Sequence, residues 1–130
     1  MPLIVTIDGP AGSGKSTVAK KLAKKLALIH LNSGALFRAV GLVAEGQGVD
    51  LSSDKAVSSV AASIDFDFTL NEEGVTKFKV TGPLVGEREI EKEIASEHAG
   101  DLASRVAVLP GVRELMLQVQ RRIGSTTGLV

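Results

Sequence analysis

Apolar residues follow two different spacings in the first thirty positions, and each spacing predicts one type of element. Residues 3–7 and 27–31 are short, mostly apolar runs of the kind that forms buried strands. Between them, Val18, Leu22 and Leu26 recur every fourth position with lysines on the other faces, which predicts a helix packed on a sheet. A strand, a helix and a second strand in this order predict a parallel α/β sheet.

Two further helices are predicted before residue 64. Residues 32–45 carry apolar side chains at helical spacing and are followed by glycines at 46 and 48. Ser52 or Ser53 is suitable as the N-cap of a second helix that runs to about residue 63. The apolar positions of this second helix are Ala56, Val57, Val60 and Ala61.

The pattern changes to strict alternation at Ile64. Residues 65–70 alternate polar and apolar side chains, residues 71–74 have the composition of a turn, and residues 75–81 alternate less cleanly. These features predict a small antiparallel hairpin. A hairpin placed between the helices of an α/β protein indicates a separate subdomain.

Charge dominates the next segment, and a helix is predicted to close the chain. Residues 87–97 have Ile90 and Ile94 as their only bulky apolar residues, an i, i+4 pair that predicts an exposed helix. After a stretch of small residues, Pro110 is suited to open a last helix that Gly124 ends. Its apolar side is predicted to consist of Val112, Leu115, Val119 and Ile123. Residues 128–130 have the composition of a further buried strand.

The strongest chemical signal is the glycine-rich octet at residues 9–16, which lies between the first predicted strand and the first predicted helix. Such a phosphate-binding loop, or P-loop, surrounds the phosphates of a nucleotide with backbone N–H groups, and glycine permits the close approach. Lys15 is the predicted catalytic residue because it would reach the β- and γ-phosphates of the nucleotide, ATP or GTP, and the Ser16 hydroxyl is the predicted Mg²⁺ ligand. The residues assigned to this nucleotide are Gly9, Pro10, Ala11, Gly12, Ser13, Gly14, Lys15, Ser16 and Thr17. A chance match is disfavoured because the motif is complete and stands in the required setting.

Composition excludes several classes of protein. The 15 basic and 15 acidic residues cancel, and there is no Trp or Tyr, so neither charge nor aromatic platforms favour nucleic acid or an anionic membrane as a partner. The absence of Cys excludes disulfides and thiolate metal sites, and two isolated histidines disfavour a His-based metal cluster. The first apolar run is too short for a signal peptide or a membrane span. We therefore expect a cytoplasmic protein, and we take it to be a monomer.

A second cluster of polar groups follows the second predicted strand, at residues 31–38. In parallel sheets ligands bind at the carboxyl ends of the strands. The amide of Asn32, the hydroxyl of Ser33, the ring of Phe37 and the guanidinium of Arg38 would suit a nucleobase and its phosphate, with Arg38 holding the phosphate through a bidentate fork. The alternative is a capped helix, with Ser33 as its N-cap and Arg38 on its surface. These residues alone leave both interpretations open.

Together with residues 7–17 and 103–113, this cluster closely resembles the amino-terminal portion of bacterial cytidylate kinases, over essentially all 130 residues. In that family, a box of the form Asp-Ser/Thr-Gly-Ala-Met/Ile-Tyr-Arg binds the nucleoside monophosphate, and a later arginine holds its phosphate. Ser33, Gly34, Arg38 and Arg113 match these positions as they stand, and Phe37 replaces the tyrosine.

The resemblance implies a transferase of pyrimidine nucleotide metabolism. Its fold would be an incomplete parallel sheet of the P-loop nucleoside-monophosphate-kinase type, formed by residues 1–63 and 104–130. A small β-rich insertion at residues 64–103 would bind the nucleoside monophosphate. The implied reaction is ATP-dependent phosphorylation of CMP or dCMP to CDP or dCDP, with Mg²⁺.

The chain departs from the family pattern at three positions and in its length. Asn32 replaces a carboxylate, Phe37 lacks the tyrosine hydroxyl, and Ala95 lies where an arginine is frequent, which makes Arg88 a candidate replacement. Family members also continue into a Gly-Arg-Asp motif and an arginine-rich lid. Because such arginines stabilise the charge of the transferred phosphoryl group, we expect the 130-residue chain to be incomplete and to transfer phosphate poorly.

Two other functions remain alternatives. Another small-molecule kinase would have the same P-loop, although the residues at 33–38 and 104–113 argue against it. A nucleotide-binding module without turnover is consistent with a chain that lacks the lid. Formation of CDP from ATP and CMP distinguishes the proposed kinase from both.

Overall fold

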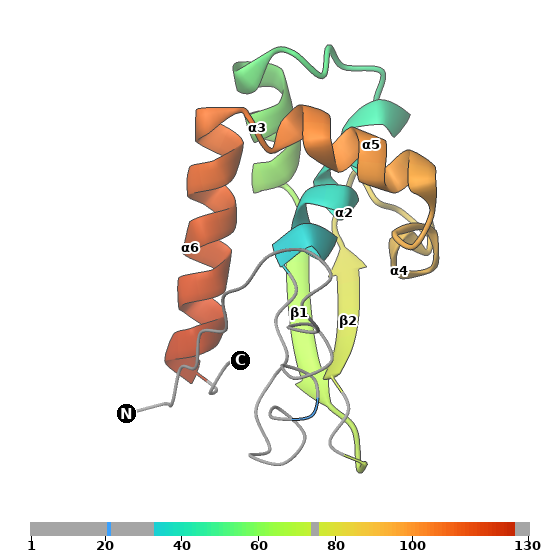
Figure 1. The fold of residues 1–130 in the computed structure, drawn as a ribbon, viewed down its shortest axis with the longest axis vertical. Coiled ribbons are helices and arrows are strands. Elements are labelled where there is room, and N and C mark those ends of the chain that lie inside the picture. The colour runs from blue at the N-terminus through green and yellow to red at the C-terminus, as the bar shows by residue number, and fades with distance from the viewer. Residues whose placement is uncertain (1–20, 22–32, 74–75, 127–130) are drawn as a thin grey trace. The chain divides into compact units, whose positions relative to one another are not determined.

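A computed structural model describes Lys21 and residues 33–73 and 76–126 of the chain. The P-loop and the strands predicted at residues 3–7, 27–31 and 128–130 lie outside this part, so the parallel sheet stays a prediction. Lys21 is helical and exposed, within the first predicted helix. The sheet in the described part is a two-stranded antiparallel one, surrounded in the sequence by helices (Figure 1).

The elements of the described part follow one another in this order: α2 (Ser33–Gly46), α3 (Asp54–Ala62), β1 (Asp65–Leu70), β2 (Thr76–Thr81), α4 (Ile90–Glu93), α5 (Glu97–Val106) and α6 (Pro110–Thr126). The chain divides into two compact units. The larger one consists of Asn32–Asp67 and Phe78–Val119, and the smaller one of Met1–Leu31, Phe68–Lys77 and Gln120–Val130. None of the described helices is both long and apolar enough to cross a membrane.

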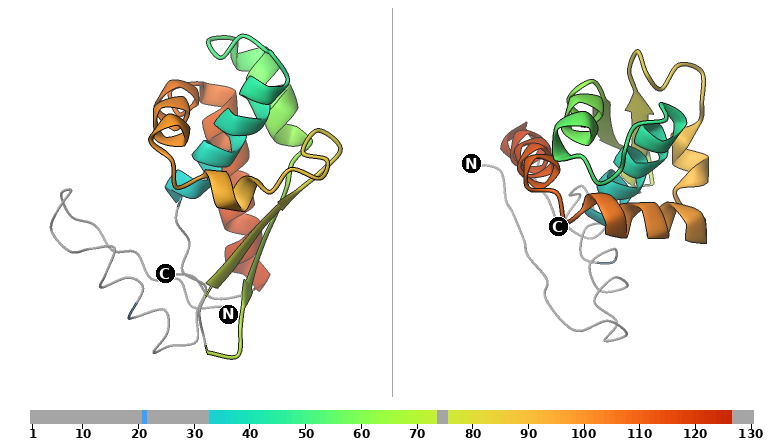
Figure 2. Two further views of the ribbon diagram at one scale, coloured as in Figure 1. Left: turned by 90° about the vertical axis from the view of Figure 1, so that its right-hand side faces the viewer. Right: turned by 90° about the horizontal axis from the view of Figure 1, so that it is seen from above.

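Helix α2 provides much of the core of the larger unit. Leu36, Val40 and Val43 are almost completely buried on it, and the helix packs chiefly against α5 (Figure 2). The two helices approach most closely where Gly41 faces Leu102. A Cβ atom added to Gly41 would lie 2.7 Å from the Cβ atom of Leu102, so this contact requires a residue without a side chain. The predicted helix at residues 32–45 is thus confirmed, in the part that the structure describes.

Helix α3 begins as its sequence predicts. Ser53 is the N-cap, and its side chain accepts a hydrogen bond from the backbone N–H of Ala56 at 3.2 Å. Just before it, Asp50 accepts hydrogen bonds from the hydroxyl and the backbone N–H of Ser52, and both lower the pKa of Asp50. Val57 and Val60 point into the core. The turn and the cap together fix where this helix starts.

The predicted hairpin is also confirmed. Phe66 and Phe68 on β1 are buried while the residues between and beside them are exposed, as alternation requires. At the base of the hairpin, the rings of Phe66 and Phe78 stack with centroids 6.2 Å apart. After β2, Gly82 has a φ of +145° and passes so close to the carbonyl oxygen of Ser63 that an added Cβ would lie 2.6 Å from it. Only glycine suits this position.

The long exposed helix predicted at residues 87–97 is wrong. The structure has one helical turn, α4, and Ile90 on it is fully buried. Ser96 then acts as the N-cap of a new helix, α5, by accepting a hydrogen bond from the backbone N–H of Ala99 at 3.1 Å. Because a cap residue has extended backbone dihedrals, a helix cannot continue through it.

Helix α6 starts at Pro110 as predicted and runs two residues past Gly124, to Thr126. Val112 and Ile123 are buried on the predicted apolar side, whereas Leu115 and Val119 are only partly buried. Met116, which the predicted side did not include, is almost completely buried.

Candidate nucleotide-binding site

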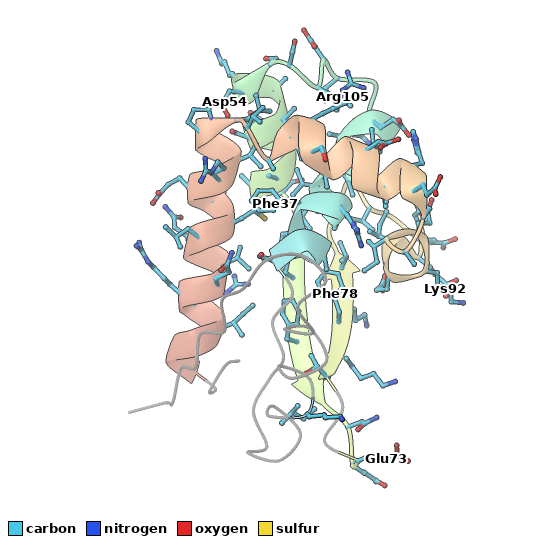
Figure 3. The ribbon with its side chains drawn as sticks, in the orientation of Figure 1. Phe37, Asp54, Glu73, Phe78, Lys92 and Arg105 are labelled. Carbon is cyan, nitrogen blue, oxygen red and sulfur yellow. The ribbon has the colours of Figure 1, made fainter. Side chains whose placement is uncertain are left out.

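The first two turns of α2 carry four of the predicted site residues. Ser33 is the first residue of the helix and is exposed, and Phe37 and Arg38 are partly buried. One helical turn separates position 33 from position 37 and position 34 from position 38. The hydroxyl of Ser33, the ring of Phe37 and the guanidinium of Arg38 therefore lie at the same end of the helix. Figure 3 labels Phe37 on this helix. The structure therefore brings Ser33, Gly34, Phe37 and Arg38 together.

Arg38 is a partly buried cation that has no partner among the described residues. Among the described residues, no hydrogen bond or ion pair engages its guanidinium. It lies beside Gly100 on α5, where an added Cβ atom would be 3.8 Å from Nη2 of Arg38. A guanidinium has five N–H donors in a planar fork that matches phosphate geometry. Arg38 is therefore free to bind an anion, and it is not simply a solvated surface residue.

Arg113 lies in the first turn of α6 and is exposed. The start of that helix is held by Asp54 on α3, whose two carboxylate oxygens accept the backbone N–H of Gly111 at 3.1 Å each. Ser58 donates its hydroxyl to the same carboxylate at 3.0 Å. A carboxylate at a helix N-terminus is stabilised by the helix dipole. Asp54, labelled in Figure 3, thus fixes the helix that carries Arg113.

Sequence analysis gave no role to Asp54. Its partner Gly111 is 57 residues away, so no local pattern joins them. The only local signal is an acidic residue at the start of α3, which by itself indicates a favourable interaction with the dipole of α3.

Arg88, the candidate replacement for the arginine missing at position 95, is already engaged. It donates to both carboxylate oxygens of Glu93, from Nε at 2.6 Å and from Nη2 at 2.8 Å. Its Nη1 donates to the carbonyl oxygen of Leu42 on α2 at 3.1 Å. These contacts tie the segment before α4 to α2, so we assign Arg88 to the structure and not to the substrate. Ala95 itself is exposed.

The Arg88 and Glu93 pair predicts a pH-dependent contribution to stability. The hydrogen bonds from Arg88 lower the pKa of Glu93. The pair therefore stabilises the fold at pH values above the pKa of a glutamate in the unfolded chain, about 4.3. This stabilisation is lost as the pH falls through the lower pKa of the folded state. Because both side chains are more than a third exposed, Glu93→Gln should lower the free energy of unfolding by only about 0.5–1 kcal/mol at pH 7.

Urea unfolding at pH 7 and pH 3 measures this effect. The difference between Glu93→Gln and the unchanged chain should be smaller at pH 3. Glu91→Gln is the matched control, since Glu91 belongs to the same helical turn and has no ion-pair partner in the described part of the chain. A loss that is equal for both variants, or unchanged at pH 3, would contradict the role of the pair.

The remaining predicted site residues lie outside the described part. These are the nine residues at positions 9–17, with Lys15 and the proposed magnesium ligand Ser16. Within the described ranges, no group of three or more His, Cys, Asp or Glu is placed to hold a metal ion.

Known cytidylate kinases resemble this chain over almost its whole length. Residues 5–130 match the cytidylate kinase family. The chain belongs to that family. The cytidylate kinase of Pseudomonas fluorescens strain Pf-5 is 39% identical over 127 residues, which are 98% of this chain and 54% of the relative. That of Vibrio cholerae is 41% identical over the same shares, and that of Azotobacter vinelandii is 40% identical over 99% of this chain and 55% of the relative.

The described elements agree with the fold class that the cytidylate kinase family implies. The family implies a P-loop nucleoside-monophosphate kinase fold, and the helices and antiparallel hairpin of the described part agree with its α/β class. The chain spans about half the length of the curated cytidylate kinases it matches.

Proposed function

We propose that this chain supplies the ATP-binding and CMP-binding residues of a cytidylate kinase. The enzyme transfers the terminal phosphoryl group of ATP to CMP or dCMP and releases CDP or dCDP. The observation that carries the proposal is the family match over residues 5–130, and the unpartnered, partly buried guanidinium of Arg38 supports it.

The donor side of the site is assigned to the P-loop. Backbone N–H groups of residues 11–17 hold the phosphates of ATP, and Lys15 neutralises the charge that develops on the transferred group. The Ser16 hydroxyl is a hard oxygen donor of the type that Mg²⁺ prefers. When bound, Mg²⁺ supplies further positive charge next to the phosphates. No general base is needed, because a phosphate oxygen of CMP is already anionic at neutral pH.

The acceptor side is assigned to α2 and α6. Ser33, Gly34 and Phe37 contact the nucleoside, and Arg38 and Arg113 hold its phosphate. Asn32 lacks the carboxylate of the family pattern, so charge-assisted hydrogen bonding at this position is weaker. Phe37 keeps the aromatic ring but lacks the hydroxyl.

The proposal includes the remaining expectations from the sequence. Residues 1–63 and 104–130 form a core with a parallel sheet, residues 64–103 form the inserted subdomain, and the protein is a cytoplasmic monomer. Size-exclusion chromatography with light scattering measures the oligomeric state directly.

Calorimetry and an assay of CDP formation on the 130-residue chain test the function. We expect CMP to bind and AMP and shikimate to bind more weakly, and Arg38→Gln to weaken the binding of CMP. Phosphorylation of AMP or shikimate in preference to CMP would contradict the proposal, as would a chain that binds no CMP.

A nucleotide-binding role without turnover is the second candidate, because the chain spans about half the length of its curated relatives. Kinases of this type turn over at roughly 1–100 s⁻¹. A rate in that range would exclude the second candidate. Binding of ATP and CMP without CDP formation would favour it.

A further inference from the structure

Gly100 stands in the interior of α5, where glycine is less favourable than alanine for helix stability. At Gly41, the other helical glycine of this contact, close packing explains the choice, since an added Cβ would lie 2.7 Å from Leu102. No such packing exists at Gly100. Apart from its own helix, the only described atoms within 4 Å of an added Cβ are Nη2 and Nε of Arg38, at 3.8 and 4.0 Å.

The neighbour of Gly100 is thus the guanidinium that the proposed function assigns to the substrate phosphate. That guanidinium is partly buried and has no hydrogen-bond or ion-pair partner among the described residues. A methyl group at position 100 would only touch it, because 3.8 Å is an ordinary contact distance. A longer side chain would occupy the space that the guanidinium now occupies.

We propose that Gly100 is a positioning residue for Arg38. The bare backbone of α5 at this point leaves the guanidinium room to adopt the rotamer that meets the phosphate of a bound nucleoside monophosphate. Gly100 acts only through Arg38 and does not touch the substrate. The inference rests on the proposed function and adds to it a determinant of affinity on a second helix.

A double-mutant cycle tests the inference, with the affinity for CMP measured by calorimetry on the 130-residue chain. Gly100→Leu should weaken CMP binding about tenfold, the scale of one charge-assisted hydrogen bond. Gly100→Ala should bind CMP almost as the unchanged chain does. In the Arg38→Gln background, Gly100→Leu should have no further effect, because its target is gone.

Glu97→Leu is the matched control. Glu97 is an exposed residue of α5 three positions before Gly100 and outside the 103–113 segment, and the same leucine there should not weaken the binding of CMP. Melting temperatures of all variants show whether each is folded. If Gly100→Leu does not fold, Gly100→Gln, with a long side chain of good helix propensity, replaces it.

The failures of the two proposals are distinguishable. If the unchanged chain binds no CMP, the proposed function fails and this inference fails with it. If the unchanged chain binds CMP and Gly100→Leu binds it equally well, the inference alone is overturned. It is also overturned if Gly100→Leu weakens CMP binding just as strongly when Arg38 is already replaced.

Discussion

Replacing Lys15 with methionine should lower the rate of CDP formation by on the order of 10²–10³-fold, the usual effect of removing one group that stabilises transition-state charge. Methionine keeps the length of the side chain but removes its positive charge, and with it the attraction for the β- and γ-phosphates. The affinity for ATP should fall at least about tenfold, because a hydrogen bond to a charged group is lost. A coupled assay of CDP and calorimetry with ATP measure the two effects.

Lys21→Met is the matched control for this prediction. Lys21 is an exposed helical residue six positions further along the chain, and its replacement removes the same charge without touching the loop. Equal rates for the two variants would contradict the assignment of Lys15. Normal ATP affinity in Lys15→Met would show that the lysine does not reach the nucleotide.

The fold should be most sensitive to a side chain at Gly41. The first atom of that side chain would lie 2.7 Å from Cβ of Leu102 and 3.2 Å from the carbonyl carbon of the same residue. Neither atom moves when the side chain of Leu102 rotates, so α2 and α5 must separate. Gly41→Val should lower the free energy of unfolding by about 2–3 kcal/mol, the upper range for overpacking.

Gly46→Val provides the comparison in the same helix. Among the described atoms, an added Cβ at Gly46 meets only Nη1 of Arg88, at 2.9 Å, and this terminal nitrogen can move away with the loss of one hydrogen bond, to Leu42. Urea unfolding should therefore show a clearly smaller loss for Gly46→Val. A loss as large as that of Gly41→Val would contradict the role assigned to the contact with Leu102.

Elements with local signals were predictable from the sequence. Ser53 caps α3 because a serine hydroxyl can reach the backbone N–H three residues on, and this signal lies within four consecutive residues. The hairpin was predictable because Phe66 and Phe68 alternate with exposed neighbours. In both cases the information that decides the structure lies close together in the chain.

The segment between the hairpin and α6 was not predicted correctly. The i, i+4 spacing of Ile90 and Ile94 favoured one helix, whereas the cap at Ser96 ends the first turn and starts α5. Helix α5 itself was missed because alanine, glycine and charged residues dominate it. Its buried positions, Ala99, Leu102 and Val106, do have helical spacing. A search that counted alanine among the apolar residues of a helix face would have found them.

In the candidate site, too, local groupings could be predicted and contacts between distant residues could not. Ser33, Gly34, Phe37 and Arg38 could be grouped from the sequence because one helix carries all four. The contacts that hold other parts of the site could not be predicted from the sequence. Asp54 meets Gly111, and Gly100 meets Arg38, only after the helices have packed. Tertiary contacts of this kind produce no periodic pattern in the sequence.

The close approach of Gly82 to the carbonyl oxygen of Ser63 has a consequence for how this chain can be altered. The backbone enters the hairpin beside Ser63 and leaves it at Gly82, so the two ends of the hairpin are in contact. A segment with touching ends can be shortened, lengthened or exchanged for another one without displacing the helices on either side. A replacement hairpin could be joined at Ser63 and Gly82, provided that it keeps apolar side chains at the buried positions of Phe66 and Phe68.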